Sequence, residues 1–225
     1  MNNPGTLSVV ATPIGNLGDI TERAVATLRA SDVVCCEDTR VTAKLLAAYE
    51  IKVSLLSLHE HSDDATIAKV VHLLEEGKQV SYVSDAGTPG ISDPGGKLVA
   101  AVAAAGIRVV PIPGPSAMTA ALSIAGFPTE PFVFLGFPPH KKGRNTFFAD
   151  VAAREDAVVL YESTHRIMKT LAALPQARVA LVGRELTKLH ETLYRGTVAE
   201  VTAQLEKTSS KGEFVIVLAP TFWTL

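Results

Sequence analysis

The most informative stretch of the sequence reads Val80-Ser81-Tyr82-Val83-Ser84-Asp85-Ala86-Gly87-Thr88-Pro89-Gly90-Ile91-Ser92-Asp93-Pro94-Gly95. Its mostly apolar beginning is typical of a β-strand, which stops at Ser84. A loop rich in glycine and proline follows. Asp93 then predicts the start of a helix, because Pro94 would occupy the first helical position, where no N–H is needed. This order of strand, loop and helix predicts an α/β fold that binds a ligand at the loop.

Two common nucleotide-binding loops are excluded by their spacing. A P-loop needs a lysine directly after its second glycine, yet Lys97 comes one position late after Gly95, and Leu98 offers no hydroxyl to magnesium. The dinucleotide pattern G-x-G-x-x-G is also absent, since residues 12–19 carry too few glycines at the wrong positions. Nucleotide hydrolysis and nicotinamide chemistry are therefore disfavoured.

The composition is that of an ordinary globular protein. Apolar residues make up 47% of the 225 residues and the net charge is −2, so the chain can bury a core but lacks bulk attraction for nucleic acid. The adjacent Cys35 and Cys36 indicate buried strand residues in a reducing compartment. No signal peptide is evident, and the apolar run Leu98–Ile107 is far shorter than a membrane span, so we expect a cytoplasmic protein.

Strand-like runs alternate with helical stretches along the first half of the chain, which predicts a doubly wound, mostly parallel sheet. The predicted strands are Leu7–Ala11, Asp32–Cys36, Val53–Ser57, Gln79–Ser84 and Arg108–Ile112. The predicted helices are Thr21–Ala30, Arg40–Tyr49, Ala65–Glu76 and Pro94–Ala105. Asp19 and Glu22 predict a capping box for the first helix, and Gly77 and Gly106 predict helix C-caps.

The stiff segment Pro111–Pro115 predicts a junction between two domains, residues 1–114 and 115–225. The second domain is predicted to be a smaller, mixed α/β unit. Its predicted strands are Phe132–Leu135, Val158–Tyr161, Val179–Val182, Glu191–Arg195 and Phe214–Leu218. Its predicted helices are Ser116–Ala125, Asn145–Arg154, Thr164–Leu174 and Val198–Lys207.

Four unusual clusters follow predicted strands of the first domain. They are Thr12-Pro13-Ile14-Gly15-Asn16, Glu37-Asp38-Thr39-Arg40, the loop Ser84–Gly95, and Pro113-Gly114-Pro115-Ser116-Ala117. Each alone is explained by a tight turn or a helix cap. Because strand ends that precede helices lie along one edge of a parallel sheet, the four together predict a single binding site at that edge.

Motifs of one known family occur in order over almost the whole chain. They are Ala11-Thr12-Pro13-Ile14-Gly15-Asn16-Leu17, Asp19-Ile20-Thr21, Glu37-Asp38-Thr39-Arg40, Ser84-Asp85-Ala86-Gly87-Thr88-Pro89, Pro113-Gly114-Pro115-Ser116, Tyr161-Glu162-Ser163-Thr164-His165-Arg166, Arg184-Glu185-Leu186-Thr187-Lys188 and Gly212-Glu213. The chain thereby resembles the bacterial family of small-subunit ribosomal RNA methyltransferase I, in the tetrapyrrole-methylase superfamily. The resemblance implies a homodimeric two-domain enzyme that binds S-adenosyl-L-methionine in a cleft completed by the second domain. The implied acceptor is a cytidine 2′-hydroxyl in the decoding region of small-subunit (16S) rRNA.

The resemblance also implies which residues surround the cofactor. They are Thr12, Pro13, Ser84, Asp85, Ala86, Gly87, Thr88, Ser116 and Ala117, with Glu162 and Arg184 at the border. Their chemistry is compatible, because Asp85 would balance the sulfonium and ammonium charges and Gly87 would let the backbone approach the ligand. Ser116 would either bind the methionine carboxylate or cap its helix.

Methyl transfer requires that the acceptor oxygen, the methyl carbon and the sulfur be aligned. A base would help deprotonate the hydroxyl, and the candidates are Glu37, Asp38, His59 and Glu60. Arg40 either pairs with Asp38, as a cap and its partner do, or binds a phosphate or the acceptor. Glu37, Asp38 and Arg40 are therefore the catalytic candidates. The sequence His59-Glu60-His61 has no evident third ligand, so we predict no metal site.

The densest cationic run, Lys141-Lys142-Gly143-Arg144, follows an aromatic and proline-rich segment. It is either a solvated loop or, together with Arg166, a contact for RNA phosphates. Two other functions remain open: methylation of a tetrapyrrole carbon, which gives these cations no role, and a non-catalytic RNA-binding assembly module. Family members continue into a helical extension beyond the last strand, whereas this sequence stops at Leu225, so we expect its contacts with RNA to differ there.

Overall fold

The structure, a computed structural model, describes residues 4–59, 64–92 and 95–224. The chain divides into two compact units, Met1–Ser116 and Ala117–Leu225, which are described in turn. Within the described ranges, no helix has both the length and the apolar character to cross a lipid bilayer.

The first unit is built on a parallel sheet with the strand order β3-β2-β4-β1-β5. Its strands are β1 (Thr6–Val10), β2 (Val33–Cys36), β3 (Ser54–Ser57), β4 (Val80–Val83) and β5 (Arg108–Ile112). In the centre of the sheet, Leu7 of β1 pairs with Val80 on one side and Val109 on the other. The predicted doubly wound α/β fold is therefore confirmed.

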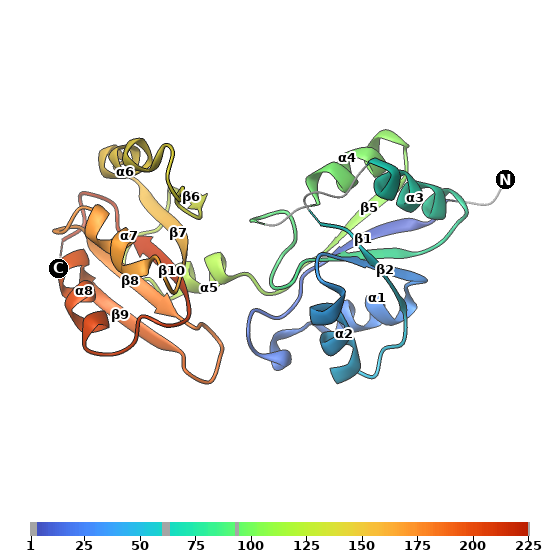
Figure 1. The fold of residues 1–225 in the computed structure, drawn as a ribbon, viewed down its shortest axis with the longest axis horizontal. Helices are drawn as coiled ribbons and strands as arrows, with labels where there is room; N and C mark the ends of the chain where they lie inside the picture. Colours follow the sequence, from blue (N-terminus) through green and yellow to red (C-terminus); the bar gives the residue numbers. More distant parts are fainter. Residues whose placement is uncertain (1–3, 60–63, 93–94, 225) are drawn as a thin grey trace. The chain divides into compact units, whose positions relative to one another are not determined.

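Helices cover both faces of this sheet (Figure 1). They are α1 (Glu22–Ala30) and α2 (Thr39–Ala48) on one face, and α3 (Asp64–Glu75) and α4 (Gly96–Ala104) on the other. One apolar core joins Leu28 and Leu46 to the sheet, and a second joins Leu74 and Leu98 to it. Strand β4, at the centre of the sheet, is buried along its whole length because helices cover both of its faces, and the hydroxyl of its one polar residue, Ser81, lies 2.7 Å from that of Ser31.

In the first unit, one predicted helix is capped by a different residue, and the predicted start of another lies outside the described residues. The cap of α1 is Thr21, whose side chain accepts a hydrogen bond from the Ala24 amide, so the predicted capping box of Asp19 and Glu22 is wrong. Asp19 instead ends a short 3-10 helix, η1 (Leu17–Asp19). The predicted start at Asp93 and Pro94 lies outside the described residues, and α4 begins at Gly96.

The C-terminal ends of α3 and α4 carry the predicted glycine caps. Gly77 and Gly106 have φ angles of 89° and 70°. In both, the glycine amide and the amide after it donate to carbonyls of the last helical turn, which is the Schellman arrangement. These caps turn the chain directly into β4 and β5.

The second unit contains a mixed sheet with the order β6-β7-β10-β8-β9. Its strands are β6 (Phe132–Gly136), β7 (Ala157–Ser163), β8 (Val179–Arg184), β9 (Thr192–Thr197) and β10 (Glu213–Leu218). Only the pair β6 and β7 is parallel among these neighbours. The prediction of a mixed α/β unit is therefore confirmed.

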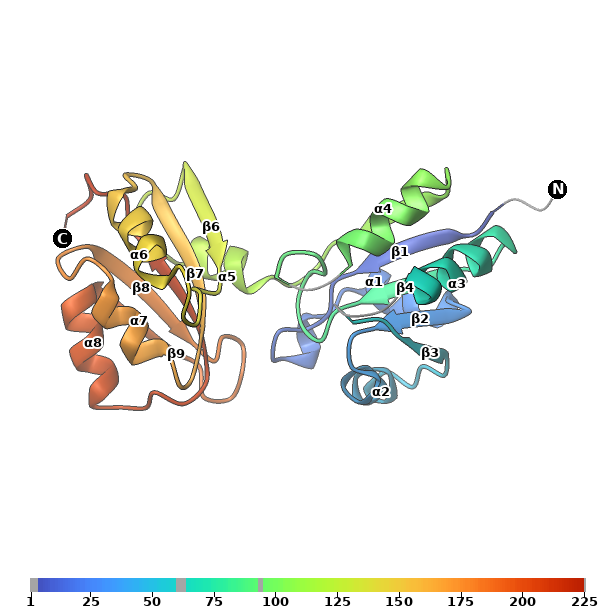
Figure 2. The same cartoon turned by 45° about the horizontal axis from the view of Figure 1, so that its top comes forward.

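Three helices pack against one face of the second sheet, and a short helix lies on the other (Figures 1 and 2). The three are α6 (Arg144–Ala153), α7 (Ile167–Ala173) and α8 (Val198–Glu206), and the short one is α5 (Ala117–Ser123). Helix α7 begins three residues later than predicted, because Thr164 is occupied outside the helix. Its hydroxyl donates to the carbonyl of Gly212 and accepts from the Gly212 amide.

Both cysteines are buried and reduced, as predicted for strand residues of β2. Burial and the neighbouring Cys36 raise the pKa of Cys35 to about 12. A thiol with such a pKa is inert at neutral pH, so these residues belong to the core.

Candidate functional site

The four sequence clusters meet at the carboxyl edge of the first sheet. Thr12, after β1, exchanges backbone hydrogen bonds of 2.9 and 3.0 Å with Gly87, after β4. The Asp38 amide, after β2, donates to Asp85 Oδ1 at 3.1 Å. The Thr88 hydroxyl donates to the carbonyl of Pro115, after β5, at 3.1 Å. The loop after β4 thus touches each of the other three clusters, as parallel strand ends require.

Two of the expected cofactor residues are buried and hold this loop together. Thr12 is 1% exposed and its hydroxyl lies 3.4 Å from the Ser84 carbonyl, to which it donates. The Ser84 hydroxyl donates to the Ala86 carbonyl at 3.3 Å. Asp85 and Ala86 are exposed, which leaves their surface available to a ligand.

Gly87 occupies a place in the loop that only glycine fills without strain. Its φ of +80° lies in the left-handed region, and a Cβ there would come within 3.3 Å of Ile14 Cγ2. Gly90, in the same loop, has a φ of +82° but nothing within 4 Å of its Cβ position. Any side chain at position 87 would therefore press on the cluster after β1.

The cluster after β2 combines a helix cap with an ion pair. Asp38 caps α2 by accepting from the Arg40 amide at 2.8 Å, and Arg40 Nη2 lies 2.6 Å from Asp38 Oδ2. Hydrogen bonds from the Arg40 side chain and backbone lower the pKa of Asp38 to about 2. The structure thus contains the helix cap and the ion pair with Arg40, which were one of the two interpretations of this motif. The Arg40 side chain remains 86% exposed, so it still reaches solvent.

Other catalytic candidates follow the strands directly. Glu37 is partly exposed at the end of β2, and His59 is exposed after β3. Glu60 and His61 lie outside the described residues.

Two of the expected cofactor residues stand at the start of α5. Ser116 immediately precedes this helix, and Ala117 is its first residue.

Glu162 has internal partners in the second unit. Its side chain is fully buried, Oε1 accepts from the Ser163 amide at 2.8 Å, and Oε2 accepts from the Thr170 hydroxyl at 2.5 Å. Arg166 Nε lies 3.1 Å from Oε1, close enough for an ion pair although the N–H is not aimed for a hydrogen bond. Both oxygens are therefore engaged by the protein itself.

Arg184 is likewise engaged at the end of β8. It donates to the carbonyls of Lys211 at 2.5 Å and His190 at 3.1 Å. Nearby, Lys188 pairs with Glu185 at 3.0 Å and with Glu213 at 2.8 Å. Burial opposes ionisation of Glu185, but hydrogen bonds from the Glu213 backbone and from Lys188 outweigh it and lower the pKa. These motif residues join β8 to the start of β10.

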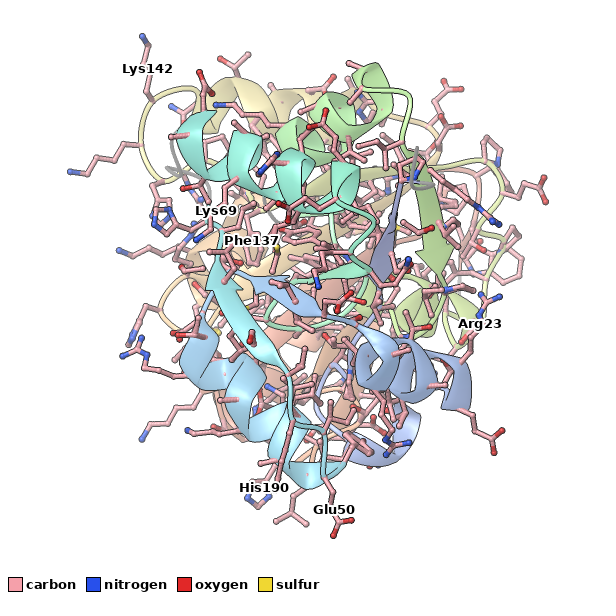
Figure 3. All side chains as sticks on the ribbon, turned by 90° about the vertical axis from the view of Figure 1, so that its right-hand side faces the viewer. Arg23, Glu50, Lys69, Phe137, Lys142 and His190 are labelled. Atoms are coloured by element: carbon pink, nitrogen blue, oxygen red, sulfur yellow. The ribbon has the colours of Figure 1, made fainter. Side chains whose placement is uncertain are left out.

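The expected RNA-binding cations separate into two kinds. Arg144 donates to the Pro139 carbonyl at 3.1 Å and to the Thr170 hydroxyl at 3.0 Å. Arg166 donates to the Pro138 carbonyl and lies 2.8 Å from His140 Nε2. Lys141 and Lys142, by contrast, are exposed, and Lys142 extends from its loop away from the ribbon (Figure 3). The arginines hold the backbone that carries the lysines.

Two further residues, neither of them among the predicted site residues, form hydrogen bonds that support these side chains. Thr170 is fully buried and joins Arg144 to Glu162. The Tyr161 hydroxyl accepts a hydrogen bond from the Met118 amide, in the first turn of α5. Tyr161 stands in a family motif, but a lone threonine in a helix gives no sequence signal.

Comparison with known proteins identifies the family. The family described as Tetrapyrrole (Corrin/Porphyrin) Methylases matches residues 6–202. The chain belongs to the tetrapyrrole methylase family. A relative from Xylella fastidiosa, named ribosomal RNA small subunit methyltransferase I, is 47% identical over 97% of this chain and 82% of its own length. A relative of the same name from Thermotoga maritima is 44% identical over 96% of this chain and 98% of its own length.

Solved structures of low sequence identity share the fold. A diphthine synthase superposes with a TM-score of 0.74 at 14% identity, covering 96% of this chain and 90% of its own. A uroporphyrin-III C-methyltransferase from Thermus thermophilus gives a TM-score of 0.66 at 22% identity, covering 96% and 94%. Because proteins with such different names share the architecture, the fold alone does not name the acceptor.

Proposed function

We propose that this chain transfers a methyl group from S-adenosyl-L-methionine to the 2′-hydroxyl of a cytidine ribose in the decoding region of small-subunit (16S) rRNA. The observation that carries the proposal is the 43–48% identity, over nearly the whole chain, to relatives named ribosomal RNA small subunit methyltransferase I. Such a protein would act in the cytoplasm. The homodimer implied by the resemblance stays a prediction.

The cofactor site is proposed at the carboxyl edge of the first sheet. Asp85 presents an exposed carboxylate there, which suits a ligand that carries a sulfonium and an ammonium group. Thr12, Ser84 and Gly87 hold the loop in shape, and Pro13, Ala86, Thr88, Ser116 and Ala117 complete the proposed surroundings. Because Glu162 and Arg184 have partners in their own unit, we propose that they support neighbouring structure.

The cofactor supplies an activated methyl group, so the protein's task is to orient the acceptor and keep water away. A useful general base has a pKa near the working pH, and the pKa of Asp38 is about 2. Asp38 is therefore better suited to fixing Arg40 than to accepting a proton. We propose Glu37, at the end of β2, or His59, after β3, as the base, and Arg40 as the group that orients the acceptor or its phosphate.

The exposed pair Lys141 and Lys142 is the proposed contact with RNA phosphates. A chain of net charge −2 has little general affinity for free RNA, so local cations must position the substrate. Arg144 and Arg166 contribute through the loop backbone that they hold.

The test is methyl transfer to purified small ribosomal subunits at several salt concentrations. Changing Lys141 and Lys142 together to alanine should lower the rate and flatten its salt dependence by about one to two counterions, since two phosphate contacts are lost. The matched control changes two other exposed lysines, Lys52 and Lys207, to alanine, which alters the net charge equally. An unchanged rate and salt slope would remove the lysine pair from substrate binding.

The same assay decides between the alternatives. Turnover of a tetrapyrrole, without methylation of any RNA by the wild-type protein, would replace the proposed acceptor. Subunit binding with neither methyl transfer nor affinity for S-adenosylhomocysteine would indicate the non-catalytic assembly module.

A further inference from the structure

Phe137 exposes an aromatic ring four residues before the lysine pair in the sequence. Its side chain is 53% exposed, directly after the end of β6. The ring contacts Tyr161 in an edge-on arrangement with the centroids 5.6 Å apart, and Tyr161 in turn contacts Phe134 at 4.9 Å. Phe137 is thus supported by an aromatic neighbour while about half of its surface faces solvent.

The segment that follows is held rigidly by two arginines. Arg166 binds the carbonyl of Pro138, and Arg144 binds the carbonyl of Pro139. Both arginines are connected to the buried Glu162. Arg166 forms an ion pair with it, and Arg144 donates a hydrogen bond to Thr170, which in turn donates one to Glu162. We call residues 137–143 the basic loop. Its backbone is therefore held at Pro138 and Pro139 before a ligand arrives, which lowers the entropic cost of binding.

The chemistry of the basic loop selects the kind of partner. Single exposed apolar side chains are ordinary, and Phe132, at the other end of β6, is 44% exposed with Glu130 two residues before it. Phe137 differs because Lys141, Lys142 and His140 follow it and no acidic residue lies in the loop. An exposed ring and two exposed lysines in one loop suit an unpaired nucleotide, which offers a flat base and a phosphate.

We propose that Phe137 is a stacking platform for an unpaired base of the RNA substrate, while Lys141 and Lys142 contact the neighbouring phosphates. The proposal rests on the proposed function, since it assumes that RNA is the acceptor. Stacking of one base on an aromatic side chain corresponds to about 10- to 100-fold in affinity. Phe137 would then position the substrate and take no part in the chemistry.

The first experiment separates binding from turnover. For Phe137→Leu, the KM for small subunits should rise about 10- to 100-fold, with kcat and the affinity for S-adenosylhomocysteine unchanged. Phe137→Tyr keeps the aromatic face and should retain the wild-type KM, as should the control Phe132→Leu. If Phe137→Leu and Phe132→Leu give the same KM, the stacking proposal is wrong.

A second experiment measures contact without turnover. Phe137→Trp, in a Trp223→Phe background, should lose fluorescence as small subunits are added, because a base stacked on the indole quenches it. Phe132→Trp in the same background should not. If the fluorescence of the two tryptophan reporters changes equally, or if neither changes, the proposal is wrong. Subunits that bind through another surface of the protein would give this result. The fluorescence readout tests stacking without requiring methyl transfer. Absence of methyl transfer by the wild-type protein would refute the proposed function, and the stacking proposal would still be tested.

Discussion

Replacing Thr170 by valine tests whether the support beneath the basic loop contributes to stability. Thr170 lies in α7 and is fully buried. Its hydroxyl donates to Glu162 Oε2 at 2.5 Å and accepts from Arg144 Nη2 at 3.0 Å. Valine has nearly the same shape, so Thr170→Val removes both hydrogen bonds without opening a cavity.

The cost follows from what the two partners lose. A hydrogen bond to a charged group contributes about 1.5–3 kcal/mol, and the buried Glu162 oxygen would have no water to replace it. Arg144 is only partly buried and keeps its bond to Pro139, so its loss is about 0–1 kcal/mol. The free energy of unfolding should therefore fall by about 1.5–4 kcal/mol, a large part of the ~5–15 kcal/mol typical of a domain.

Urea denaturation followed by circular dichroism measures this difference. Thr202 in α8 is the matched control, because its hydroxyl donates only to the Val198 carbonyl of its own helix, at 2.7 Å. Thr202→Val should change the free energy of unfolding by less than about 0.5 kcal/mol. If Thr170→Val costs no more than Thr202→Val, the Glu162 network does not stabilise the second unit and our reasoning is refuted.

Two further predictions concern the first unit. Gly87→Ala and Gly90→Ala should each lose about 1–2 kcal/mol of stability, because both glycines have positive φ angles. Only Gly87→Ala should also weaken S-adenosylhomocysteine binding, by about tenfold in calorimetry, because its Cβ would press on Ile14. Equal affinities of the two variants would mean that the cofactor binds elsewhere. Nuclear magnetic resonance titration should give Asp38 a pKa of about 2, and Arg40→Ala should raise it toward the ordinary 3.8. Because the folded-state pKa of Asp38 is depressed, the stabilisation from Asp38 is complete above about pH 4 and disappears as the pH falls through about 2. An unchanged pKa of Asp38 in Arg40→Ala would contradict the assignment of the shift to Arg40.

The sheets and the meeting of the four clusters could be predicted because they depend on local patterns. Apolar runs such as those of β4 and β10 are bounded by turn residues, and parallel strand ends have to share an edge. Helix starts were harder, because Asp19 and Thr21 both stand where a cap would fit. Thr21 is the cap since its oxygen reaches the Ala24 amide.

The roles of the charged residues were the least predictable from sequence. Arg144 resembles its neighbours Lys141 and Lys142 in charge, but it alone contacts the buried Thr170. Which cation turns inward depends on long-range packing between α6 and α7. The partners of Glu162 lie close to it in sequence, one, four and eight residues later, but they meet it only because α7 packs against the end of β7.

The contacts between the loops of the first unit determine how much sequence change this edge of the sheet can tolerate. Thr12 and Gly87 are joined through backbone atoms on both sides, and the contacts of Asp85 and Thr88 each end on a backbone amide or carbonyl. Most amino acids offer the same backbone groups, so many side chains along this edge can be exchanged while the loops keep their places. The edge of the sheet can thereby keep its shape while its sequence changes, which accords with superpositions that persist at 14–22% identity.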